Sequence, residues 1–104
     1  MQKYIVQITP KALNDIDAIY NYIFDVLQAP IAALQQRNRI LQGIESLDFF
    51  PRRIKTINNT FCSKHEIRQL PIDNYSIFFV IRDNCVIILR VLYSASDIYT
   101  RLEE

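Results

Sequence analysis

Three consecutive segments in the second half of the chain read as β-strands, and they restrict the choice of fold more than any other feature. They are HEIRQLPI (65–72), NYSIFFVIR (74–82) and CVIILRVLY (85–93), all rich in β-branched and aromatic residues. Asp73-Asn74 and Asp83-Asn84 stand at the two junctions. Because Asp and Asn tolerate the positive φ of tight hairpin turns, we predict three sequential antiparallel strands.

The last of these strands is predicted to be central. Residues 86–92 are apolar at every position except Arg90, which is typical of a strand covered on both faces. Residues 2–8 alternate apolar and polar side chains, as a short strand with one better-buried face does. We therefore predict that this first strand lies beside strand 85–93, with its direction and register left open.

Two helices are predicted between the first strand and the other three. Thr9 can cap the first helix with its hydroxyl, and Pro10 suits the first helical position. Pro30 begins a second, antiparallel helix, which Phe49-Phe50-Pro51 ends. The apolar stripes are Leu13, Ile16, Tyr20, Ile23 and Leu27 on the first helix, and Ala33, Ile40, Ile44 and Leu47 on the second; Asn14, Asp15, Asp17, Asn21 and Asp25 are expected to face solvent.

Together these elements predict one α+β domain over residues 1–104, with the order β-α-α-β-β-β. A helical hairpin would pack on one face of an antiparallel-rich four-stranded sheet. Residues 52–63 show no clear period and are predicted to be a loop. The last segment, SASDIYTRLEE, is either a short helix capped by Ser94 or Ser96 or a mobile tail.

Composition excludes several classes of protein. Half of the 104 residues are apolar, yet no run approaches the roughly 18 residues of a membrane span, and the N-terminus does not resemble a leader, so we expect a cytoplasmic protein. A net charge of +1 predicts weak direct binding to nucleic acid at most. Cys62 and Cys85 lack metal-site spacing and read as two partly buried thiols. No cofactor or metal is expected.

The chain resembles the RelE/ParE superfamily of toxins over nearly its whole length. Three phrases carry the resemblance: ITPKALNDIDAIYNYI, IESLDFFPRR, and HEIRQLPIDNYSIFFVIRDNCVIILRVLYSASDIYTRL. In that family a helix follows a "TP.A" motif, a Leu precedes "FP", an "R.L" strand leads into a "Y.I.Y" strand, and an apolar strand ends in "VLY..RD". The resemblance implies a type II toxin–antitoxin system, in which a cognate antitoxin wraps the toxin, and it is closer to the ParE-like branch.

The resemblance leaves the cellular target open. Some family members cut messenger RNA on the ribosome, whereas the ParE-like branch is associated with DNA gyrase. RNA cleavage without a metal requires cations and a positioned acid and base. Where RNase members carry Arg this chain has Ser76, where they carry His or Arg it has Tyr93, and Ala95-Ser96-Asp97 replaces their "RRD" motif.

Five residues remain that could serve an RNase: Arg68, Arg82, Arg90, Tyr93 and Tyr99. Three of them also have a structural interpretation. Arg68 can brace Glu66 or Asp73, Arg90 can pair with Asp97, and Tyr99 can pack the tail onto the sheet. His65 is the only histidine and reads as a surface residue.

The preferred hypothesis is a toxin without enzymatic activity that binds and inhibits a protein target such as DNA gyrase. Five aromatic residues are candidates for protein contact: Tyr20, Tyr22, Phe49, Phe50 and Phe61. The alternatives are a ribosome-dependent mRNA endonuclease and an inactive relic that only binds antitoxin. Under each of them a short antitoxin is expected to cover the helical hairpin or a free sheet edge.

Overall fold

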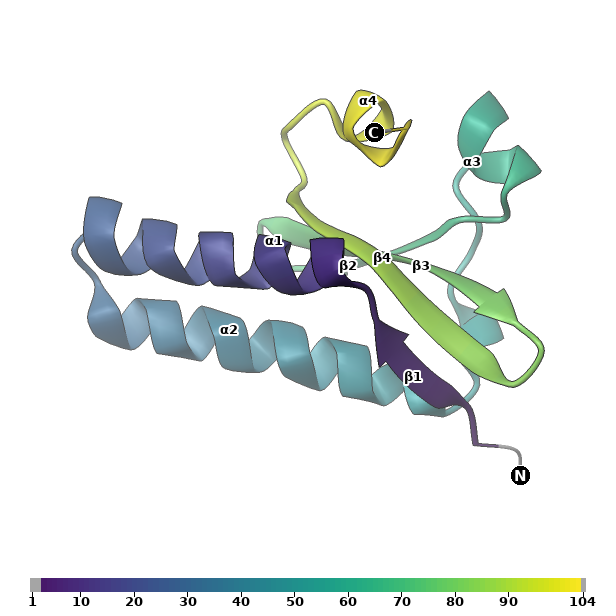
Figure 1. The fold of residues 1–104 in the computed structure, drawn as a ribbon, viewed down its shortest axis with the longest axis horizontal. Helices are drawn as coiled ribbons and strands as arrows, with labels where there is room; N and C mark the ends of the chain where they lie inside the picture. Colours follow the sequence, from purple (N-terminus) through teal and green to yellow (C-terminus); the bar gives the residue numbers. More distant parts are fainter. Residues whose placement is uncertain (1–2, 104) are drawn as a thin grey trace.

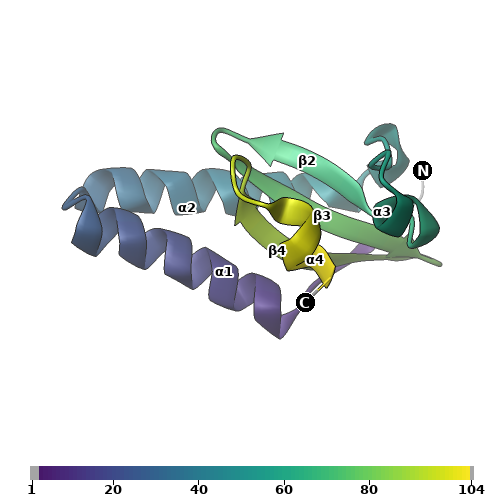
Figure 2. The ribbon, with the colours of Figure 1, turned by 90° about the horizontal axis from the view of Figure 1, so that it is seen from above.

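The computed structural model describes residues 3–103 and has helices on both faces of one sheet (Figure 1). Two long helices form a hairpin on one face, and two short helices lie on the other (Figure 2). The strands are β1 (Ile5–Ile8), β2 (Arg68–Ile72), β3 (Tyr75–Arg82) and β4 (Cys85–Tyr93). The helices are α1 (Pro10–Asn21), α2 (Pro30–Glu45), α3 (Thr60–Lys64) and α4 (Ile98–Glu103).

The strand order is β1-β4-β3-β2, so β4 is central and β1 is its neighbour, as predicted. β1 runs parallel to β4, while β2, β3 and β4 form the two predicted antiparallel hairpins. Asp73 and Asp83 take φ of 56° and 55° at the hairpin turns. Pro71 lies on the edge strand β2, where the missing amide proton costs no central hydrogen bond.

Local signals set the start of the helical hairpin. The Thr9 hydroxyl oxygen accepts a hydrogen bond from the Ala12 amide at 3.2 Å, and Pro10 is the first helical residue. α1 continues through a π-helical turn, Tyr22–Val26, before Gln28 turns the chain with φ of 53°. The hairpin buries a core against the sheet that includes Ala12, Ile16, Ile40, Ile44, Leu47, Ile77, Phe79, Ile81, Val86, Ile88 and Val91.

The other face of the sheet has a smaller core. Ile57, Cys62, Ile67, Phe78, Val80 and Leu92 form it, and side chains from α3 and α4 pack against them. Both cysteines are free, and burial raises the pKa of the Cys62 thiol, which keeps it protonated.

The sequence missed several local features. Residues 52–63 are not a plain loop, because they include part of a 3₁₀ turn at Pro51–Arg53 and most of α3, which Asn59 caps. β2 begins at Arg68 rather than at residue 65, and residue 2 of the predicted first strand lies outside the described range. The C-terminal segment is helical, but α4 begins directly after Asp97, so neither Ser94 nor Ser96 caps it.

Two expectations for the helix surfaces also need correction. Leu13 and Leu27, predicted to face the core, are 49% and 55% exposed. Asp15, predicted to face solvent, has a side chain that is only 11% exposed. Within residues 3–103 no helix has both the length and the apolar character of a membrane span.

Candidate functional site

The five candidate RNase residues do not converge on one place. Arg68 pairs with Phe79 across β2 and β3, and Arg82 pairs with Cys85 next to the β3–β4 turn. Tyr93 lies at the opposite end of β4, facing Tyr75 across the ladder. Arg90 is in the second half of β4, and Tyr99 is on α4. The sheet therefore separates these groups instead of assembling an acid, a base and a cation cluster.

Arg68 is bound to the main chain rather than to a carboxylate. Its Nη1 donates to the Ile54 carbonyl at 2.5 Å and, more weakly, to the Arg52 carbonyl at 3.5 Å. Burial and then the Arg52 charge lower the pKa of its guanidinium, while Glu66 acts in the opposite direction. The predicted hydrogen-bonding partner Asp73 instead accepts hydrogen bonds from Arg39 Nε at 2.6 Å and Gln36 Nε2 at 3.0 Å, which lower its pKa.

The Arg82 guanidinium also donates its hydrogen bonds to backbone carbonyls. Its Nη1 donates to Ile81 at 2.9 Å and its Nη2 to His65 at 3.2 Å. His65 is exposed, as predicted, and its ring lies 4.6 Å from that of Phe61. These contacts tie the end of α3 to β3, which is a structural role.

Arg90 pairs with Asp15 on α1, not with Asp97 as predicted. Arg90 Nε and Nη2 donate to the two carboxylate oxygens at 2.7 and 3.0 Å, and the Val91 amide adds a third bond at 3.0 Å. The two side chains are 13% and 11% exposed. The β-ladder shifts register between Phe78 and Phe79, opposite this part of β4. The pair joins the edge of β4, beyond the end of β1, to the first long helix.

The positions that lack family cations have structural partners instead. Ser76 is fully buried, accepts a hydrogen bond from Gln69 Nε2 at 2.9 Å, and lies 2.7 Å from the Ser94 hydroxyl. Tyr93 is 49% exposed and meets the Tyr75 ring edge-on, with centroids 5.8 Å apart. Tyr99 is 43% exposed.

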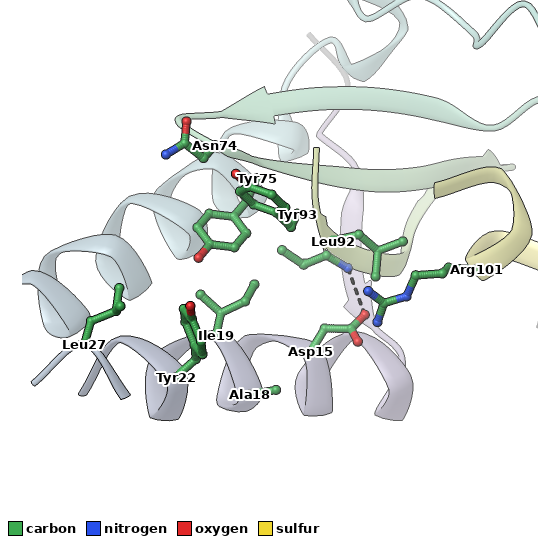
Figure 3. A pocket seen from close by; sticks show the side chains of 11 residues that line it. Asp15, Ala18, Ile19, Tyr22, Leu27, Asn74, Tyr75, Leu92, Tyr93 and Arg101 are labelled. Carbon is green, nitrogen blue, oxygen red and sulfur yellow. Dashed lines mark hydrogen bonds between the residues drawn. The ribbon is translucent and has the colours of Figure 1, made fainter. Parts of the chain in front are cut away.

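A groove of about 580 Å³ runs between α1 and the ends of β3 and β4 (Figure 3). Its size falls in the range of roughly 300–1,000 Å³ that is common for ligand pockets. Its aromatic lining consists of three tyrosines, Tyr22, Tyr75 and Tyr93, and Asp15 and Arg101 lie toward one end. Burial, and then the neighbouring Tyr22 and Tyr93 phenols, raise the pKa of the Tyr75 hydroxyl.

A second exposed apolar feature lies where α1 leads into α2, and we call it the hairpin-tip patch. The hairpin projects beyond the sheet in Figure 1, so no strand covers this end. The patch consists of Tyr22, Phe24, Val26, Leu27, Ile31 and Leu34, whose exposed fractions run from 41% to 75%. Tyr22 and Leu27 belong to both the patch and the groove.

Sequence reasoning found this surface only in part. Of the five aromatic residues proposed for protein contact, Tyr22, Phe49 and Phe50 are about half exposed, whereas Tyr20 and Phe61 are partly buried. It missed Tyr75 and Arg101, because the groove joins three segments far apart in the chain. Residues 3–103 contain no cluster of three or more His, Cys, Asp or Glu side chains suited to a metal ion.

A family model described as the ParE toxin of the type II toxin–antitoxin system parDE matches residues 6–98, and the chain belongs to this family. Comparison with curated protein sequences finds no match.

Two solved structures have the same fold. One is the chromosomal ParDE toxin–antitoxin system of P. aeruginosa, at 24% identity and a TM-score of 0.73, covering 88% of this chain and 96% of that one. The other is the RelBE2 toxin–antitoxin complex of Mycobacterium tuberculosis, at 20% identity and a TM-score of 0.61, covering 92% and 97%.

Proposed function

We propose that this chain is a cytoplasmic toxin that a cognate antitoxin neutralises and that acts by binding and inhibiting a protein target, DNA gyrase. The observation that carries the proposal is the state of the three candidate arginines. Each donates hydrogen bonds to the protein's own carbonyl or carboxylate groups. Arginine side chains engaged in this way are not available to stabilise the negative charge that develops on the phosphate during RNA cleavage.

The exposed apolar surface supports a protein partner. Single exposed apolar residues are ordinary, whereas a continuous patch on a small chain marks an interaction site. Here the groove and the hairpin-tip patch meet at Tyr22 and Leu27. Both structural relatives named above come from toxin–antitoxin systems, and that supports an antitoxin as one such partner.

A supercoiling assay tests the gyrase target. Purified toxin is added to gyrase and relaxed plasmid, and we expect supercoiling to fall and cleaved plasmid to accumulate as the toxin reaches excess. Toxin saturated with its antitoxin is the control and should leave supercoiling intact. Unchanged supercoiling and no cleavage at a large excess of active, folded toxin would exclude gyrase.

The messenger RNA endonuclease is kept as a second candidate because Tyr93 and Tyr99 are 49% and 43% exposed. It requires cuts in translated RNA at preferred codons, which mapping of 5′ ends after toxin induction detects. A map identical to that of uninduced cells removes this candidate. If induction does not slow growth at all, the inactive relic becomes the better description.

A further inference from the structure

The positive charge of this chain is concentrated in one stretch, which the net charge of +1 conceals. Residues 49–68 hold five lysines and arginines and only one carboxylate, that of Glu66. The rest of the chain holds seven such cations and ten carboxylates. A chain divided in this way presents a local positive potential that its total charge does not predict.

Three of these five cations follow two exposed phenylalanines in the segment 49–55, which we call the aromatic-basic loop. Phe49 and Phe50 are 47% and 60% exposed, and Arg52 and Lys55 are exposed as well. The loop follows the C-terminal end of α2, at the opposite end of the helical hairpin from the hairpin-tip patch (Figure 1). None of its residues lines the groove, so it is a separate surface.

The backbone of the aromatic-basic loop is strained and braced. Phe50 has a φ of 45°, a left-handed conformation that is unfavourable for a bulky residue. Arg53 stabilises this turn, because its Nη1 donates to the carbonyl oxygens of Phe49 at 2.7 Å and Phe50 at 3.1 Å. Arg68 holds the next part of the loop through the Ile54 carbonyl. Strained residues of this kind are concentrated at functional sites.

Two cations of the loop are left for a partner. Among residues 3–103, the side chains of Arg52 and Lys55 have no hydrogen bond or ion pair. The carboxylate that precedes the loop, Asp48, lies 3.8 Å from the Lys3 ammonium instead. Burial and then the Arg52 charge lower the pKa of the Arg68 guanidinium, so a bound anion would relieve repulsion between the two arginines.

We propose that the aromatic-basic loop contacts duplex DNA, with Arg52 and Lys55 on backbone phosphates and Phe50 inserted into the minor groove. Arg and Lys bind phosphates whatever the sequence, and proteins that bend DNA insert apolar side chains between base steps from the minor groove. This combination favours duplex DNA over an acidic protein segment, which the cations alone would satisfy. The inference rests on the proposed function, because the DNA would be the segment on which gyrase acts.

The test measures binding of the full-length toxin to a short fluorescein-labelled DNA duplex by fluorescence anisotropy. Two phosphate contacts predict that the affinity falls roughly tenfold between about 50 and 200 mM salt. We expect Arg52→Glu to weaken binding at the lower salt concentration by about tenfold. Arg37→Glu is the control, because it changes the net charge equally on the exposed face of α2, where its guanidinium stacks only on Tyr20. It should weaken binding by less than about twofold.

A second variant removes the aromatic part of the surface without a risk to folding. Phe50→Gly deletes the ring but suits the positive φ at this position, so this variant should be at least as stable as the wild type. It should bind the duplex at least about threefold more weakly, because the apolar insertion is lost.

Several results would overturn the inference. Equal affinities for Arg52→Glu, Phe50→Gly and Arg37→Glu would show that the loop does not contact DNA. Tighter binding of the wild type to single-stranded RNA of the same length would assign the loop to RNA. No binding to the duplex at low salt, with gyrase inhibition weakened by Arg52→Glu, would assign it to the gyrase protein. The supercoiling assay with wild-type toxin decides the proposed function separately, because it does not depend on these variants.

Discussion

The Asp15–Arg90 pair shows how one charged residue, Arg90, can be accommodated in an apolar strand. Arg90 would be costly to bury alone, and both side chains are nearly buried. The Arg90 guanidinium contacts both carboxylate oxygens of Asp15, and the Val91 amide donates to the oxygen that Nε also contacts. These bonds satisfy most of the polar groups involved. Such a pair adds little net stability compared with an apolar replacement, but removing one partner leaves a buried charge.

We therefore predict that Asp15→Ala is strongly destabilising. It removes the buried carboxylate that accepts two hydrogen bonds from Arg90 and one from the Val91 amide, so the free energy of unfolding should fall by about 3–5 kcal/mol. Urea unfolding of Asp15→Ala, Arg90→Ala and the double variant measures the coupling between them. The double variant should lose clearly less than the two single losses added together. A loss below about 1 kcal/mol in Asp15→Ala would contradict this account.

We predict that ionisation of Tyr75 lowers the stability of the folded protein at alkaline pH. Its pKa is raised in the folded protein, whereas in the unfolded chain it is about 10. Below that pH both states keep the proton, but above it the unfolded chain loses the proton first, so unfolding becomes more favourable as pH rises. Melting curves between about pH 8.5 and 11 should show wild type losing stability faster than Tyr75→Phe. Parallel pH dependence of the two proteins would show that Tyr75 does not contribute.

At the scale of elements, Thr9 joins two of them at once. Its hydroxyl accepts from the Ala12 amide at the start of α1 and donates to the Leu89 carbonyl of β4 at 3.0 Å. We predict that Thr9→Ala lowers the free energy of unfolding by about 1–2 kcal/mol, as loss of a helix cap does. Thr9→Ser keeps the hydroxyl and is the control in the same denaturation experiment. Equal losses in both variants would assign the effect to the missing methyl group.

The elements that the sequence predicts well are those set by adjacent residues. Thr9-Pro10 begins α1 and the Asp-Asn dipeptides turn both hairpins, because each of these signals acts over a few residues. α3 was missed because a five-residue helix contains too few turns to show a period. The parallel direction of β1 was left open, since direction depends on the whole connection between the strands.

The candidate site was less predictable because its contacts are distant in the chain. Asp15 and Arg90 are 75 positions apart, and no local pattern distinguishes Asp15 from the exposed acidic residues of α1. Arg68 was predicted to brace Glu66 or Asp73, but its acceptors are main-chain carbonyls of residues 52 and 54, which carry no signal in side-chain chemistry. The absence of the cations that RNase members of the family carry, by contrast, can be seen directly in the sequence, one position at a time.

At the scale of the whole molecule, the two faces of the sheet are covered unequally. The long hairpin covers one face and extends past it, whereas α3 and α4 cover the other with eleven residues in total (Figure 2). The molecule is accordingly elongated, with extents of 40 × 32 × 21 Å. The hairpin tip lies beyond the reach of the sheet, and this geometry leaves its apolar side chains exposed rather than buried.

A toxin without its antitoxin should therefore associate with itself through the hairpin-tip patch. Ile31 is 75% exposed, so Ile31→Glu should change the free energy of unfolding by less than about 0.5 kcal/mol while reducing self-association. Leu13→Glu is the matched control, because Leu13 is 49% exposed on α1 but lies outside the patch. Light scattering over a concentration series should show a smaller mean mass for Ile31→Glu than for wild type or Leu13→Glu. Equal masses for all three proteins would mean that the patch does not drive association.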